Sequence, residues 1–192
     1  MAGGAGSRLD MGEKPLVKIS GKPMLQYVAG AFLEAGHEIL IITSDLVPMT
    51  KNWCRAKGFD QYNASGAGYV EDLFECIRET SLDGPVFSCV SDLPGINPEI
   101  IEEIFETYIR EGKPALSVWV PEKYFIEAGC IPSYTEIVEN CSACPVGLNI
   151  VDASMADVAQ DEYRLLLNKP ELAYNVNCKK DFESFLKFIK NK

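Results

Sequence analysis

The first 14 residues combine closely spaced glycines with two cationic side chains: Gly3, Gly4 and Gly6 are followed by Arg8 and Lys14. Glycine has no side chain, so its backbone N–H can come close to phosphate oxygens. Arg and Lys add charge that can follow a triphosphate into the transition state. The segment therefore predicts a phosphate-binding loop, with a flexible terminus as the alternative. It lacks both the Gly-Lys-Ser/Thr ending of a Walker A loop and the glycine spacing of a dinucleotide fingerprint.

A carboxylate stands at the end of a buried apolar segment. The segment passes through Ser88, and Asp92 follows it, two residues before Pro94. Mg²⁺ prefers oxygen ligands and usually takes only one or two from the protein, while water and phosphate supply the rest. Asp92 is therefore the predicted metal ligand and, with Arg8 and Lys14, a predicted catalytic residue. The alternative is a turn-forming Asp before a proline.

A loop of small residues, including Ser65 and Gly66, leads into a helix that begins at Tyr69. A flat base can lie against such a backbone. The N1–H and amino groups of guanine need acceptors, which a loop carbonyl or Asp72 can supply. We therefore predict that this segment binds the nucleotide base. In the alternative interpretation, Glu71 and Asp72 only favour the positive end of the helix dipole.

Two later segments carry further polar candidates. Gly147 can bring the backbone next to a bulky ligand, and Asn175 or Asn177 can offer a side-chain oxygen to metal or phosphate. Taken alone, both segments are also typical of strand edges.

The thiols and the single histidine suggest less. Seven cysteines, an odd number, are spread along the chain, which is typical of a protein in a reducing cytoplasm. Cys141 and Cys144 form a CxxC that leaves zinc binding, redox chemistry and a plain loop as alternatives. His37 follows a glycine at a helix-to-strand turn, where we expect it to face solvent.

Apolar strands alternate with amphipathic helices in a single domain, residues 1–192. This pattern predicts a Rossmann-like α/β fold, with a mostly parallel central sheet flanked by helices and ligands at the carboxyl ends of the strands. The predicted strands are Glu38–Thr43, Pro85–Val90, Ala115–Val120, Val146–Val151 and, more weakly, Ala173–Asn177. The predicted helices are Lys22–Ala35, Tyr69–Thr80, Pro98–Glu111 and Asp181–Lys190.

Composition excludes several classes of protein. Hydrophobic residues make up 47% and charged residues 24% of the chain, as in a globular protein. The net charge of −10 disfavours a nucleic-acid partner. Residues 1–22 nevertheless carry four basic and two acidic side chains, so the local charge suits a small polyanion. No apolar run is long enough for a membrane span, and we expect no secretion signal.

The motifs together resemble a known family. GGAGSRL with DMGEKPL, the strand ending at Asp92, and NVN near the C-terminus resemble nucleotidyltransferases of the molybdenum-cofactor guanylyltransferase type. They also resemble the wider nucleotide-diphospho-sugar transferase fold. ASGAGYVEDLFECI, SCVSDLPGI, PVGLNIV and AYNVNCKKDF are more similar to the archaeal GTP:adenosylcobinamide-phosphate guanylyltransferases of cobalamin synthesis. This resemblance implies transfer of GMP from GTP to a phosphorylated corrinoid, with Mg²⁺ as cofactor and pyrophosphate as product.

The resemblance also implies residue roles. It places the glycines of the first loop, with Arg8 and Lys14, on the triphosphate, Asp92 and Asn177 on Mg²⁺, and the GYVED segment beside the base. By the same resemblance Gly147 lies beside the nucleotide and acceptor. Guanylyl transfer to molybdopterin and a non-catalytic nucleotide-binding module are the alternatives, and monomer and homodimer both stay open.

The family places a short apolar strand directly before its glycine-rich loop. Here only Met1 and Ala2 precede Gly3, so we expect a truncated first strand. Such a strand would leave N–H and C=O groups of its neighbours unpaired and hold the phosphate loop loosely.

Overall fold

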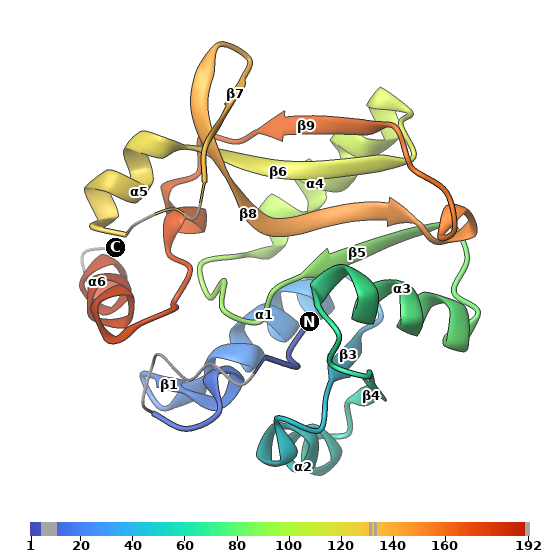
Figure 1. The fold of residues 1–192 in the computed structure, drawn as a ribbon. Coiled ribbons are helices and arrows are strands. Elements are labelled where there is room, and N and C mark those ends of the chain that lie inside the picture. The colour runs from blue at the N-terminus through green and yellow to red at the C-terminus, as the bar shows by residue number, and fades with distance from the viewer. Residues whose placement is uncertain (5–10, 131, 133, 191–192) are drawn as a thin grey trace.

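Strands and helices alternate along the computed structural model, which describes residues 1–4, 11–130, 132 and 134–190 (Figure 1). The α-helices are α1 (Met24–Glu34), α2 (Pro48–Lys57), α3 (Tyr69–Thr80), α4 (Pro98–Glu111), α5 (Glu122–Ala128) and α6 (Lys179–Lys190). The strands are β1 (Lys18–Ile19), β2 (Lys22–Pro23), β3 (Leu40–Thr43), β4 (Asp60–Asn63), β5 (Pro85–Cys89), β6 (Ala115–Pro121), β7 (Glu136–Val138), β8 (Cys141–Asp152) and β9 (Glu162–Leu166). Short 3-10 helices cover Lys14–Leu16, Ala153–Met155 and Pro170–Ala173.

The long strand β8 lies inside the main sheet, whose order is β5-β8-β6-β9. Ile150 of β8 pairs with Phe87 of β5 on one side and with Leu116 of β6 on the other, and both pairings are antiparallel. β9 runs parallel to β6, and β7 pairs antiparallel with β8. The α/β class is confirmed, and the sheet is mixed where the strand–helix alternation predicted a mostly parallel one. A buried apolar strand has the same composition in either direction, so the sequence did not reveal the reversal.

The first two residues connect the main sheet to the parallel pair β3-β4. Ala2 N donates to Ile42 O at 2.7 Å, and Ser91 N donates to Met1 O at 3.1 Å. The amino group of Met1 donates to Cys89 O at 2.8 Å. Figure 1 shows this end of the chain between β3 and β5. Met1 and Ala2 thus occupy the place of the short first strand and supply hydrogen bonds to both neighbours.

Helices cover both faces of the sheet. Neighbouring residues of β5 point to opposite sides, as in any strand: Phe87 packs with the cluster formed by α1, α4, β6 and β8. Val86 packs with the cluster that contains Leu73 and Ile77 of α3. This layered packing fixes the strand ends from which the polar loops emerge.

Several predicted elements are found at or near their expected positions. α4 spans Pro98–Glu111 as predicted, with Asn97 accepting from Ile100 N at 2.9 Å and Gly112 in the left-handed region. α3 spans the predicted Tyr69–Thr80, while α1 and α6 differ from prediction by one or two residues at their ends.

The last predicted strand is wrong. Residues Ala173–Asn177 contain the end of a 3-10 helix and an irregular segment, and Val176 N donates to Asp92 O at 3.0 Å instead of joining a ladder. Strand β9 forms one edge of the main sheet, and it was not predicted because charged residues such as Glu162 and Arg164 interrupt its apolar pattern. Helices α2 and α5 were also missed.

Helix α6 packs against the early part of the chain. Val176 and Phe185 share a buried cluster with Val17, Ile19 and Met24. The segment before α6 is thereby held beside the segment that follows Lys14. Among the described residues, no helix has the length and apolar character needed to cross a bilayer.

Candidate active site

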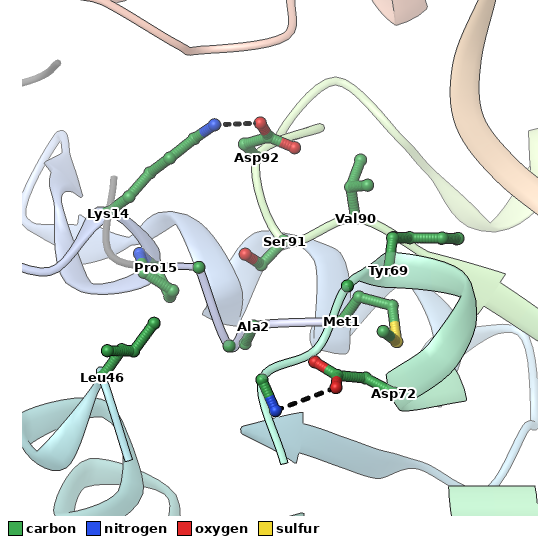
Figure 2. Close-up of a pocket in the computed structure, with 14 residues that line it drawn as sticks. Met1, Ala2, Lys14, Pro15, Leu46, Tyr69, Asp72, Val90, Ser91 and Asp92 are labelled. Atoms are coloured by element: carbon green, nitrogen blue, oxygen red, sulfur yellow. Dashed lines mark hydrogen bonds and ion pairs between the residues drawn. The ribbon is translucent and has the colours of Figure 1, made fainter. Parts of the chain in front are cut away.

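A cleft of about 290 Å³ opens where β3, β4 and β5 end (Figure 2). Seven residues that the sequence analysis assigned to the site line it: Gly3, Gly4, Lys14, Gly66, Tyr69, Asp72 and Asp92. In Figure 2 the side chains of Lys14 and Asp92 meet at one end of the cleft, and Asp72 lies at the other. The phosphate and base segments, which are far apart in sequence, therefore face one space.

The other predicted residues lie around the cleft or outside the description. Ser65 adjoins the lining residue Gly66, and Asn177 reaches the cleft through a hydrogen bond from Lys14. Gly6 and Arg8 lie outside the described residues.

The Lys14 side chain joins two of the predicted residues. Its Nζ forms an ion pair with Asp92 Oδ2 and donates a hydrogen bond of 2.7 Å to Asn177 Oδ1. The side chains of Lys14 and Asp92 are only 15% and 11% exposed, so water screens this attraction less than at an open surface. Residues predicted from three separate motifs meet around one positive charge.

The oxygens of Asp92 and Asn177 fit a hard cation. Asp92 Oδ1 is buried and accepts no hydrogen bond from the described residues. A buried carboxylate oxygen is unfavourable unless a donor, water or cation satisfies it. Asp92 Oδ2 and Asn177 Oδ1 already share a cationic partner, the Lys14 ammonium. One or two protein oxygens beside a phosphate site are the donor set that Mg²⁺ prefers.

Asp181 holds the Asn177 loop, and the sequence analysis did not identify it. Its Oδ2 accepts hydrogen bonds of 2.9 Å from both Asn177 N and Cys178 N. The hydrogen bond from Val176 N to Asp92 O ties the same loop to the backbone of the metal-binding candidate. The available signal was an acidic residue in the first turn of α6, three residues after Cys178, where a side chain can reach back to the helix start.

Glu13 anchors the segment that carries Lys14. Its carboxylate accepts from Met49 N at 2.7 Å, from Thr50 N at 2.6 Å and from Thr50 Oγ1 at 2.6 Å. These donors lie at the start of α2, where the helix dipole also favours a negative charge. Glu13 belongs to the DMGEKPL motif, in which no role was predicted for it.

Two carboxylates bind the backbone of residues Ser65–Gly68, which we call the base loop because the sequence analysis predicts that it binds the nucleotide base. Asp72 Oδ1 accepts from Gly66 N at 2.9 Å and from Ala67 N at 3.0 Å. Glu75, one turn further along α3, accepts from Ser65 N and Ser65 Oγ. Asp72 was predicted as an acceptor for the base; its Oδ1 holds the loop, and the role toward the base stays a prediction.

Ser44, at the end of β3, connects the phosphate and base loops. Its Oγ donates to Gly3 O at 2.7 Å. A Cβ added to Gly3 would lie 3.4 Å from Ser44 Cβ, and one added to Gly66 would lie 3.6 Å from it. Both loops thus pack against one buried serine.

Tyr69 links the base loop to the sheet. Its hydroxyl lies 2.9 Å from Ser88 Oγ and accepts from Asn149 Nδ2 at 3.4 Å. Burial raises the pKa of Tyr69 to about 12, so the phenol stays protonated at neutral pH. Tyr69 therefore acts here as a neutral hydrogen-bonding group in the wall of the cleft.

Gly147 lies behind Val90, which lines the cleft. Its φ is +71°, and a Cβ at this position would lie 2.8 Å from Val90 Cγ1. Val90 lines the cleft, and its N–H donates to Gly147 O at 3.0 Å. The absence of a side chain at Gly147 lets Val90 stay back from the ligand space.

The thiols and the histidine lie away from the cleft lining. All seven cysteines are free; Cys144 is buried in β8 and Cys141 is partly exposed. Across the described part of the chain, no three His, Cys, Asp or Glu side chains are grouped so as to hold a metal ion. His37 was predicted to face solvent; it is half-buried, and its ring lies edge-on to those of Phe87 and Phe105, so it is only partly exposed.

The sequence of the chain is similar to those of known proteins. Residues 1–162 match the MobA-like NTP transferase domain family. The chain belongs to this family. It is 32% identical, over 194 aligned residues, to the adenosylcobinamide-phosphate guanylyltransferase of Methanocaldococcus jannaschii. That alignment covers 95% of this chain and 92% of the relative.

Solved structures of low sequence identity share the fold of this MobA-like chain. The molybdopterin-guanine dinucleotide biosynthesis protein A of Archaeoglobus fulgidus has a TM-score of 0.68 at 15% identity, covering 100% of this chain and 97% of that one. A CMP:2-keto-3-deoxy-manno-octonic acid synthetase in complex with CTP has a TM-score of 0.72 at 15% identity, covering 94% and 93%.

The motif resemblance and the assignment to the nucleotidyltransferases are therefore confirmed. The nucleotide-diphospho-sugar transferase fold is confirmed as well. The individual roles of Lys14, Asp92 and Asn177 stay predictions, which their common position supports.

Proposed function

We propose that this MobA-like nucleotidyltransferase transfers GMP from GTP to adenosylcobinamide phosphate and releases pyrophosphate, as a step of cobalamin biosynthesis. The name of the relative that aligns with 95% of the chain supports the acceptor. The observation that carries the proposal is the meeting of Lys14, Asp92 and Asn177 at one end of a cleft whose other end is the Ser65–Gly68 loop. Seven free thiols favour a reducing compartment, so we place the reaction in the cytoplasm.

The reaction needs little acid–base chemistry from the protein. A phosphate oxygen of the acceptor attacks the α-phosphorus of GTP, and the bond from this phosphorus to the oxygen that bridges it to the β-phosphorus breaks. Pyrophosphate leaves with the bridging oxygen. A phosphate monoester has a second pKa of about 6, so the attacking group is already largely ionised at neutral pH. Catalysis then depends on alignment of two polyanions and on stabilisation of negative charge.

The chain supplies that stabilisation from two sides. Lys14 gives positive charge at the phosphate end, and the backbone N–H groups near Gly3 and Gly4 can approach phosphate oxygens. Arg8 adds a second cation by family resemblance. Asp92 and Asn177 would hold Mg²⁺, which when bound neutralises charge on the phosphates. Lys14 contacts both of these oxygens, so we expect it to exchange them for phosphate oxygens when the substrate binds.

The proposal is tested by incubating the protein with GTP, Mg²⁺ and adenosylcobinamide phosphate and measuring pyrophosphate and the GDP-linked corrinoid. We expect Asp92→Asn to lower single-turnover rates by roughly a hundredfold, as removal of one preorganised charged group does. Asp157→Asn is the control, because Asp157 pairs with Arg78 at an exposed site. Wild-type rates in Asp92→Asn would contradict the role of Asp92 as a metal ligand.

The two alternatives give different products in the same assay. Guanylyl transfer to molybdopterin would appear when molybdopterin replaces the corrinoid as acceptor. A non-catalytic nucleotide-binding module would bind GTP and release no pyrophosphate with either acceptor. Product with the corrinoid alone is the expected result.

A further inference from the structure

Three backbone N–H donors of the base loop are already bound to side-chain carboxylates. The N–H groups of three successive residues, Ser65, Gly66 and Ala67, all donate to side-chain carboxylates of helix α3. Asp72 takes two of these donors and Glu75 takes the third. A backbone donor that is already bound to a carboxylate is not free to bind a ligand.

Glu75 is fixed by more than its contact with the loop. Its Oε1 accepts a hydrogen bond of 3.0 Å from the Tyr62 hydroxyl at β4, and its Oε2 accepts one of 2.5 Å from Ser65 Oγ. These hydrogen bonds, with the Ser65 hydroxyl first, lower the pKa of Glu75 and favour its acceptor-only form. Unlike an acidic residue in the first helical turn, Glu75 lies in the middle of α3, so helix capping does not account for this arrangement.

We propose that Glu75, together with Asp72, sets the base preference of the cleft by binding three N–H donors of the loop, so that the loop offers a base mainly carbonyl acceptors. Gly66, Gly68 and Asp72 line the cleft, which places this loop within reach of a bound base. The inference rests on the proposed function, because it assumes that a nucleoside triphosphate occupies this cleft.

Guanine and adenine differ in the hydrogen-bond donors and acceptors on their base-pairing edges. The base-pairing edge of guanine carries two donors, the N1–H and the 2-amino group, and one acceptor, O6; acceptors of the loop can satisfy both donors. Adenine carries only one donor there, the 6-amino group, and its bare N1 acceptor would face another acceptor with no donor between them. An unpaired buried polar group lowers affinity, so a loop that offers mainly acceptors favours guanine over adenine. Glu75 is a positioning residue in this account, since it acts through Ser65.

The test measures nucleotide binding without turnover. The affinities of GTP, ATP and ITP are determined by calorimetry, with Mg²⁺ and without acceptor, for wild type and Glu75→Ala. We expect Glu75→Ala to free the Ser65 N–H and reduce the ratio of GTP to ATP affinity by about tenfold, which corresponds to about 1.4 kcal/mol. ITP lacks the 2-amino group and should bind wild type with intermediate affinity. Glu79→Ala is the matched control, because Glu79 is an exposed residue one turn further along α3.

Each outcome decides one point. A wild type that binds ATP as tightly as GTP would contradict the guanine preference in the proposed function itself. A wild type that prefers GTP, with the same preference in Glu75→Ala, overturns the inference and leaves the function standing. If Glu75→Ala does not fold, Tyr62→Phe removes one hydrogen bond from Glu75 and should reduce the GTP preference by a smaller factor. An unchanged preference in folded Tyr62→Phe then overturns the inference.

Discussion

Replacement of Lys14 by Met removes the positive charge that Asp92 and Asn177 share and keeps a side chain of similar length. In the wild type the ammonium contacts both oxygens, and the remaining oxygen of Asp92 has no hydrogen-bond donor among the described residues. In Lys14→Met the Asp92 carboxylate would be left without its cationic partner in a site of low exposure. We therefore expect the metal-free variant to be less stable than the wild type.

The size of the effect follows from burial. Removal of one partner from a fully buried ion pair costs about 3 to 5 kcal/mol, whereas exposed pairs contribute about 1 kcal/mol or less. The two side chains here are 15% and 11% exposed, so we take a value of about 2 kcal/mol between these limits. For a chain of this length, that destabilisation lowers the Tm by about 4 to 8 °C.

The same change should strengthen metal binding. In the wild type a divalent cation must displace Lys14 from Asp92 and Asn177 before it can bind both. Without this competition, Mg²⁺ affinity in the absence of nucleotide should rise by up to about thirtyfold, the equivalent of about 2 kcal/mol. Added Mg²⁺ should therefore restore stability to Lys14→Met more than to the wild type.

The assay is thermal unfolding of both proteins over a range of Mg²⁺ concentrations without nucleotide, with Mn²⁺ binding followed directly by electron paramagnetic resonance. Lys51→Met is the control, because Lys51 pairs with Asp45, whose side chain is 87% exposed. The reasoning is refuted if Lys14→Met has the stability of wild type and binds Mn²⁺ no more tightly.

Three other changes test further parts of the site. Asp181→Ala should weaken Mg²⁺ binding with GTP by about tenfold, because it releases two backbone N–H groups at the Asn177 loop; calorimetry measures this, and unchanged affinity would contradict the positioning role. Gly147→Ala should destabilise the fold by about 1 to 3 kcal/mol and weaken GTP binding, because its Cβ pushes Val90 into the cleft; adding Val90→Ala should recover part of both losses, and no recovery would exclude this contact as the cause. Burial raises the pKa of Tyr69 to about 12, so its contribution to stability is complete below pH of about 10 and is lost as the pH rises toward about 12. Denaturant unfolding from pH 9 to 12 should show a steeper loss for wild type than for Tyr69→Phe by at most about 2 to 3 kcal/mol, and parallel curves would count against this pKa.

Prediction from the sequence was most accurate for elements whose ends carry strong local signals. Helix α4 has a proline in its first turn, an asparagine cap and a terminal glycine, and its bounds agree with prediction. Seven of the predicted site residues line one cleft, because the carboxyl ends of neighbouring strands bring their loops together.

The misses share a physical cause, which is dependence on partners distant in sequence. Glu13 and Glu75 each bind backbone N–H groups of another segment, and no spacing along the chain indicates such a contact. The segment Ala173–Asn177 has a strand-like composition, yet its Val176 N–H bonds to Asp92 O, outside the main-sheet ladder. The direction of β8 likewise depends on its two neighbours and not on its own residues.

The packing of α6 has a consequence for how the protein matures during translation. The Asn177 loop is held by Asp181 within α6 and by the backbone of Asp92, and Phe185 seals this corner against Val17. A ribosome releases these residues after every other part of the cleft has emerged. A nascent chain can therefore assemble its base loop before its cation site, because that site also needs Asn177, which follows every residue that lines the cleft.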